Sequence, residues 1–192
     1  MGNLEDALNI GEEAVSIYRT FVVHGQDESK KDLADALHNY GITLHAMGRL
    51  DDALSTIEEA VSLYRTLVVH GQNASKRDLA HALHIYGVTL DATGRLDDAL
   101  STREEAVSLY RTLVVHGQDE SKRALADALH NYGNTLHVMG HLEDSLSVRE
   151  EAKSLYNALA VRIKGEAKAN LTKHHFFNKI KSFYALLVRG WR

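Results

Sequence analysis

The chain's twelve histidines, with several aspartates near them, are the residues that could do chemistry. His81 and His84 are three residues apart, so a helix would place both on one face, and Asp91 follows two turns later. Histidine and aspartate are ligands that Zn²⁺ accepts. A structural zinc site needs four converging ligands, however, and the chain has no cysteine and no His-Glu-x-x-His motif. We expect no metal and no cofactor, with a zinc-binding groove as the lesser alternative.

Acid–base catalysis needs a pocket that holds two groups with separated pKa values. The histidines and aspartates of this chain recur because the sequence itself recurs, and nothing beyond that repetition brings a further reactive group among them. We therefore expect that the protein is not an enzyme.

Net charge is −4, but the two signs are divided along the chain. Residues 1–161 contain 14 Lys and Arg against 25 Asp and Glu, whereas residues 162–192 contain 8 against 1. This balance gives the body of the chain no basic footprint for nucleic acid, so we expect no nucleic-acid partner. No apolar run approaches the roughly 18 residues of a membrane span. A soluble, intracellular and cytoplasmic protein is the default expectation.

One segment of the sequence is repeated three times with small changes. Leu33, Leu79 and Leu125 open successive copies with a period of 46 residues, and residues 33–78 differ from 79–124 at only nine positions. A period between 20 and 50 residues indicates a stacked array in which each unit buries its apolar face against its neighbours.

Each copy is predicted to be a pair of helices. Apolar residues recur at intervals of three or four in both halves: Leu33, Leu37, Tyr40, Gly41 and Leu44 in a first helix, then Ala53, Leu54, Ile57, Ala60, Val61, Tyr64, Leu67 and Val68 in a second. Gly48 and Gly71 are placed to end these helices in left-handed turns. Gly41 would let Ala53 approach closely, and Ser75 with Asp78 has the spacing of a capping box.

The pattern resembles the tetratricopeptide repeat. Its signature falls on residues of all three copies, although the closing proline is absent: Leu37, Tyr40, Gly41, Leu44, Ala53 and Ile57, then Leu83, Tyr86, Gly87, Leu90 and Ala99, then Leu129, Tyr132, Gly133, Leu136 and Ser145. The period of 46 rather than 34 resembles the long repeats of kinesin light chains. The resemblance implies an all-α fold, a right-handed α-solenoid of stacked antiparallel helix pairs.

The register of the copies predicts five segments. They are an orphan second helix with its loop at 1–28, repeats at 29–74, 75–120 and 121–165, and a basic amphipathic helix at 166–192. The orphan helix either caps the array or indicates that the chain is a piece of a longer one, and we favour the second interpretation. The last helix is expected to cap the array. The alternative is that its residues 174–191 lie on an anionic membrane surface.

In tetratricopeptide arrays the first helices line a concave groove that takes peptides or partner helices. The resemblance places fifteen residues of this chain on that face: Asp35, His38, Asn39, Ile42, His45, His81, His84, Ile85, Val88, Asp91, Asp127, His130, Asn131, Asn134 and His137. Four of the nine differences between the first two copies fall there. Diversified groove residues on a constant scaffold are expected when an array presents a varied surface to its ligand.

These features predict a non-catalytic scaffold or adaptor for protein–protein interaction, which binds a protein or peptide in the groove. The alternative is a self-associating or regulatory segment of a larger signalling protein. Because imidazole titrates near ~6.5, we expect the groove to become cationic near pH 6 and to bind acidic partners more tightly there. Arg103 and Arg149 stand where Ile57 does, and we expect each to pack its stem in the interface with its head at the edge.

Overall fold

The computed structural model describes the backbone of residues 2–24, 29–72, 74–115 and 121–189, and within these ranges the side chains of 4–165. The described residues form helices and turns without any strand. The helices are α1 (Gly2–Val23), α2 (Ser29–Ala46), α3 (Leu50–Val69), α4 (Ser75–Ala92), α5 (Leu96–Val115), α6 (Ser121–Val138) and α7 (Leu142–Arg189). We call α2, α4 and α6 the first helices, and α1, α3, α5 and the beginning of α7 the second helices.

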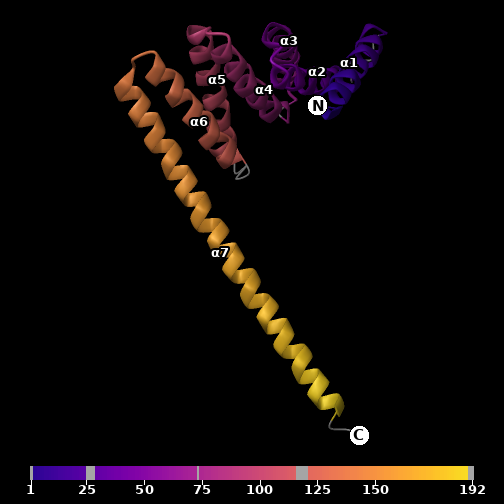
Figure 1. Cartoon of the computed structure of the whole chain (residues 1–192), viewed down its shortest axis with the longest axis vertical. Coiled ribbons are helices and arrows are strands. Elements are labelled where there is room, and N and C mark those ends of the chain that lie inside the picture. Colours follow the sequence, from indigo (N-terminus) through magenta and orange to yellow (C-terminus); the bar gives the residue numbers. More distant parts are fainter. Residues whose placement is uncertain (1, 25–28, 73, 116–120, 190–192) are drawn as a thin grey trace. The chain divides into compact units, whose positions relative to one another are not determined.

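The chain divides into two compact units, Met1–Ala152 and Lys153–Arg192. In the first unit each helix from α1 to α6 packs against the next one along the chain (Figure 1). The first helices also contact one another, α2 with α4 and α4 with α6. This is the arrangement of stacked antiparallel helix pairs that the repeat predicts, and the all-α solenoid fold is confirmed.

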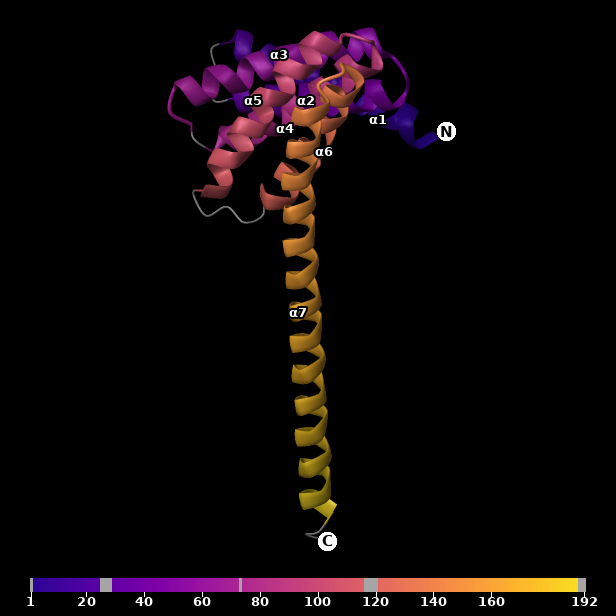
Figure 2. The same ribbon diagram turned by 90° about the vertical axis from the view of Figure 1, so that its left-hand side faces the viewer.

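Helix α7 is one unbroken helix that includes Gly165 (Figure 2). The side chains of the proposed capping helix at 166–192 lie outside the described residues, so the cap and the membrane alternative both remain predictions.

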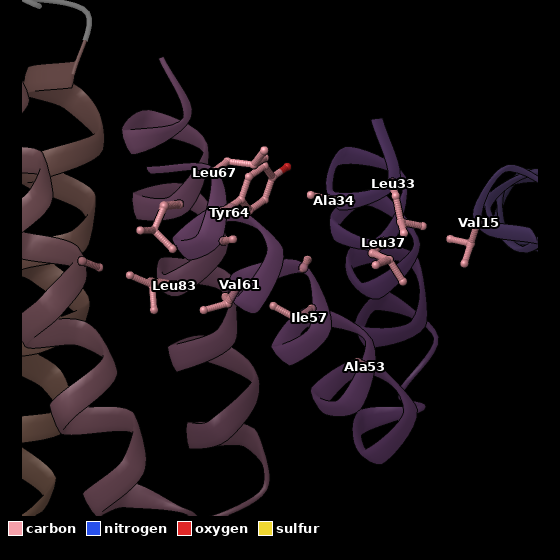
Figure 3. Packing of buried hydrophobic residues seen from close by; sticks show 14 of the residues in the cluster. Val15, Leu33, Ala34, Leu37, Ala53, Ile57, Val61, Tyr64, Leu67 and Leu83 are labelled. Carbon is pink, nitrogen blue, oxygen red and sulfur yellow. The ribbon is translucent and has the colours of Figure 1, made fainter. Parts of the chain in front are cut away.

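The core runs from one helix pair to the next without a break. Leu33 and Leu37 of α2 belong to one buried cluster with Ile57 and Tyr64 of α3, and all four side chains are at most 4% exposed. Figure 3 shows Leu33 on the side of α2 that is turned to Val15 of α1. On the other side of α3, Val61 packs toward Leu83 of α4, which joins the next pair to the same cluster. Burying a side chain of this size contributes about 1.5–3 kcal/mol, so each pair is stabilised mainly by its neighbours.

Glycine sets the turns as predicted. Gly48 and Gly71 have φ of 76° and 86°, the left-handed region that side chains disfavour. After α2, the Gly48 N–H donates to the His45 carbonyl and the Arg49 N–H to the Leu44 carbonyl, both at 2.9 Å. These bonds satisfy carbonyl groups that the end of a helix would otherwise leave without donors.

The predicted capping box at Ser75 is wrong. Helix α4 begins at Ser75 without any side-chain capping bond, and the buried Ser75 hydroxyl has no partner among the described residues. Ser75 therefore lies one position inside the helix rather than at its cap. Gly41 does lie close to Ala53, whose carbonyl oxygen would be 3.6 Å from a Cβ at Gly41, but Ile57 is closer still, with its Cγ1 atom at 2.4 Å. Gly41 thus makes room for a branched side chain at the centre of α3.

Candidate functional site

The proposed groove residues all lie on the first helices, but they differ widely in exposure. His38 is buried, and Asn39, His81, His130 and His137 are exposed. The others are half-buried: Asp35, Ile42, His45, His84, Ile85, Val88, Asp91, Asp127, Asn131 and Asn134. Helical periodicity identified this face, but the exposure of each residue depends on how closely the adjacent first helix packs.

His38 is covered because it meets a histidine of the next repeat. Its Nε2 atom lies 3.1 Å from His81 Nδ1, and the two rings pack edge to face with centroids 4.9 Å apart. Burial, with a smaller contribution from the nearby His81, lowers the pKa of His38 to about 4. Burial also lowers the pKa of His81. His38 therefore supplies no positive charge near pH 6, and His81 supplies less than a free imidazole would.

The same argument holds for His84 in the next repeat. Burial lowers its pKa to about 4, with further contributions from the charge of Arg103 and from His81. The expectation that the groove histidines turn cationic together near pH 6 is therefore wrong for His38 and His84. The sequence places these residues on helices, but only the structure shows the neighbouring helix that removes water from them.

A second polar contact joins adjacent first helices near their C-terminal ends. The buried Thr89 hydroxyl donates to the Ile85 carbonyl at 3.0 Å, so it accepts from His45 Nδ1 at 3.1 Å. One repeat later the Thr135 hydroxyl lies 3.3 Å from Asp91, which stands in the place of His45. Nothing in the sequence indicates this contact, because the threonine is identical in all three copies and comparison of the copies shows no difference at that position.

Asp91 also forms an ion pair with Arg103, which enters from α5. The Arg103 side chain is only 3% exposed, so the expectation of a head at the edge of the interface is wrong for this residue. Its Nε and Nη1 atoms have no partner among the described residues. Arg149, in contrast, is half-buried and donates to Asn134 at 2.6 Å.

These pairs change the meaning of the sequence differences. Arg103 replaces Ile57 and its partner Asp91 replaces His45, while Asn134, the partner of Arg149, stands where Ile42 does. Part of the diversity on the first helices therefore accommodates arginines inside the array rather than a ligand outside it.

Two hollows lie at equivalent places along this face, and they share Asp78 and His81. The α2–α4 hollow has a volume of about 250 Å³ and is lined by Lys31, Asp35, His38, Asn39, Tyr64, Asp78 and His81. The α4–α6 hollow has a volume of about 300 Å³ and is lined by Arg77, Asp78, His81, Tyr110, Ser121 and Ala124. Lys31, Tyr64 and Asp78 were not among the predicted groove residues because they lie nearer the N-terminal ends of the helices or on α3.

Nothing in this arrangement resembles a metal centre. In the described ranges no three His, Asp or Glu side chains come together as ligands. His81 is turned to His38, His84 lies at 3.5 Å from Asn131, and Asp91 pairs with Arg103. The residues considered for zinc thus have separate partners.

Among the residues that the structure describes, no helix is both long and apolar enough to cross a membrane.

The fold and this face define a class: an array of helix hairpins that exposes one wall of polar side chains. Residues 32–112 match the family model described as tetratricopeptide repeat, so this part of the chain consists of tetratricopeptide repeats and the predicted resemblance is confirmed. No curated protein matches the chain at a significant level.

Two solved structures with TM-scores above 0.5 show the same fold at low identity, and a third is similar at a lower score. BtubC from P. vanneervenii superposes with a TM-score of 0.62 and 15% identity over 79% of this chain and 59% of its own, so the chain spans little more than half of BtubC. MamA gives 0.51 and 17% over 83% and 85% of the two chains. TPR-like repeats of a putative kinesin light chain from Podosopora anserina give 0.47 and 14% over 83% and 89%. Identities this low speak for the fold alone.

Proposed function

We propose that the chain is a non-catalytic protein-interaction module that binds a peptide or a partner helix along its first helices. The observation that supports this proposal is that one face of those helices is apolar and buried, whereas the other face is polar and partly accessible. Leu33, Leu37 and Leu44 of α2 are at most 4% exposed, whereas the other face of the same helix carries half-buried and exposed polar groups beside a hollow. Such a face can offer hydrogen bonds to a ligand without disturbing the core.

A peptide-display selection against the whole chain tests the proposal. Replacing both Asn39 and Asn131 by Ala should lower the affinity of the selected peptides, because both amides lie on the proposed binding face. The matched control replaces the exposed Ser62 and Ser108, which are on second helices. NMR chemical shifts of the chain locate the bound peptide. If a selected peptide binds the asparagine variant and the parent equally well, and its chemical-shift changes are confined to second helices, the peptide binds elsewhere and the proposal is refuted.

A second candidate function, self-association, is favoured by one observation on α1. Ile10, Ile17 and Phe21 are 67%, 45% and 40% exposed, whereas Leu67, the equivalent of Phe21 in α3, is 5% exposed. Exposed apolar side chains on one helix are typical of a surface that another helix covers. Sedimentation of the chain between micromolar and millimolar concentration tests this: self-association raises the mass with concentration, and Phe21→Ser should then lower it.

A further inference from the structure

The α2–α4 hollow concentrates hydrogen-bond acceptors. Lys31 Nζ lies 2.9 Å from Asp35 and 3.1 Å from Asp78, so one ammonium group bridges the carboxylates of two repeats. The Tyr64 hydroxyl donates to Asp35 at 2.6 Å and holds that carboxylate from the side of α3 (Figure 3 shows Tyr64 reaching toward α2). Both carboxylates remain about one-third to two-fifths exposed, at 42% and 34%. An incoming group can therefore reach them.

The charge in this hollow is negative at neutral pH. His38 and His81 contribute none, since burial lowers the pKa of each. Two carboxylates therefore face a single ammonium group. Burial alone would lower the pKa of Lys31, but its hydrogen bonds with Asp35 and Asp78 outweigh burial and raise it, so the hollow already favours a cation.

A buried polar atom in the same hollow also has no partner. His38 lines the hollow with only 7% of its surface exposed, and its Nδ1 atom makes no hydrogen bond to any residue that the structure describes. Buried polar groups are nearly always hydrogen-bonded, to protein or to an ordered ligand or water. This observation is independent of the carboxylates, and a ligand group that forms a hydrogen bond with this nitrogen would satisfy it.

The α4–α6 hollow provides a contrast within the same chain. His81 stands there in the place of Asp35, Ala124 in the place of Asp78, and Arg77 in the place of Lys31. The lining of the α4–α6 hollow thus includes one carboxylate, Asp78, where the α2–α4 hollow has two. A ligand that spans both hollows would meet an acidic site over α2 and α4 and a less acidic, more apolar one over α4 and α6.

We infer that the α2–α4 hollow binds a basic side chain, an arginine above all, of the protein or peptide that lies along the first helices. This inference rests on the proposed function. A volume of about 250 Å³ is at the lower edge of ligand pockets, which suits one side chain rather than a whole small molecule. Arginine presents several N–H donors in a planar fork that matches a carboxylate, and it stays charged at any relevant pH. The incoming arginine can displace Lys31 from the two carboxylates, because exposed ion pairs of this kind contribute little stability.

A peptide-display selection followed by a two-sided substitution tests this inference on the whole chain. Peptides selected against the parent should be enriched in arginine or lysine at one position. Replacing that residue with citrulline, which keeps the shape and removes the charge, should weaken binding about tenfold, as expected for the loss of one hydrogen-bonded charge pair. The same peptide change should have little effect on Asp78→Asn, which keeps the Tyr64–Asp35 bond intact.

The control Asp51→Asn/Asp97→Asn removes two exposed carboxylates on second helices, so citrulline should still weaken binding to it about tenfold. If selected peptides bind the first helices without basic enrichment, or citrulline weakens binding to the parent and to Asp78→Asn equally, the inference fails while the proposed function stands. If no selected peptide binds the first helices at all, both fail.

Discussion

The α2–α4 contact and the α4–α6 contact are copies of one interface, yet they hold together by different polar pairs. In the first, Ile57 fills the centre of α3 and His45 donates to Thr89. In the second, Asp91 stands in the place of His45 and lies 3.3 Å from the Thr135 hydroxyl, and it also pairs with Arg103 of α5, which occupies the place of Ile57. A charged side chain inside a repeat thus requires a partner on the adjacent first helix. Substitutions at either interface should show how much stability each one gains from its own polar pair.

The largest effect is expected for Asp91→Ala. It leaves the guanidinium of Arg103, 3% exposed, without its counter-charge, and breaking a buried ion pair from one side costs about 3–5 kcal/mol. His45→Ala, the matched change in the first interface, removes one neutral hydrogen bond and should cost about 1 kcal/mol. Urea unfolding followed by circular dichroism measures both.

The double variant Asp91→His/Arg103→Ile gives the second interface the residues of the first. It should recover the stability lost in Asp91→Ala, since replacing a buried ion pair by packed apolar groups is often neutral or stabilising. If Asp91→Ala costs less than about 1 kcal/mol, the pair does not stabilise the second interface and the comparison fails.

The histidines of the first interface predict a loss of stability in acid. The pKa of His38 is about 4 in the folded chain and near 6.5 when unfolded, so between these values the unfolded state binds more protons. The stability is present above pH 6.5 and is lost as the pH falls toward 4. His38 alone should lower the free energy of unfolding by about 2 kcal/mol between pH 7.5 and pH 5.

Unfolding of His38→Gln at the two pH values checks this, with the exposed His130→Gln as control. The His38 variant should lose less stability on acidification than the parent, whereas the control should behave like the parent. Identical pH dependence of all three proteins would show that His38 gains its proton as easily in the folded chain as in the unfolded one.

The glycines at the centre of the first helices offer a smaller test. A Cβ at Gly41 would lie 2.4 Å from Ile57 Cγ1, whereas one at Gly87 would lie 3.0 Å from Arg103 Cγ. Ile57 is branched and stiff, but an unbranched stem can shift. Overpacking costs about 1–3 kcal/mol and is partly offset by the helix preference of alanine, so Gly41→Ala should lose about 1–2 kcal/mol and Gly87→Ala less. Thermal unfolding compares the two, and equal losses would contradict the argument.

The helix pairs, the left-handed glycine turns and the apolar stripes could be predicted from the sequence because each follows from spacing along one helix. The ion pair of Arg103 and the neutral state of His38 could not. The neutral state of His38 depends on the distance between helices a full repeat apart, and the ion pair depends on how closely α5 packs on α4 within one helix pair. Arg103 was visible as an exception within an apolar stripe, and a search for an acidic substitution in the same copy would have found Asp91. No comparable signal in the sequence indicates that His38 is covered by His81.

The smallest effect sharpens the comparison at the hollows. The Tyr64 hydroxyl donates to Asp35 at 2.6 Å, but Tyr110 faces a place where His81 replaces that aspartate, and its hydroxyl makes no such bond among the described residues. Tyr64→Phe should therefore lose about 1 kcal/mol, the typical value of one hydrogen bond, and Tyr110→Phe close to nothing. Chemical unfolding measures both, and adding Asp35→Asn tests the assignment: the loss from Tyr64→Phe should shrink, because a neutral amide oxygen accepts a weaker hydrogen bond than a carboxylate. An undiminished loss in the double variant would mean that the hydroxyl acts through another group, and the two hollows would then differ less than their residues suggest.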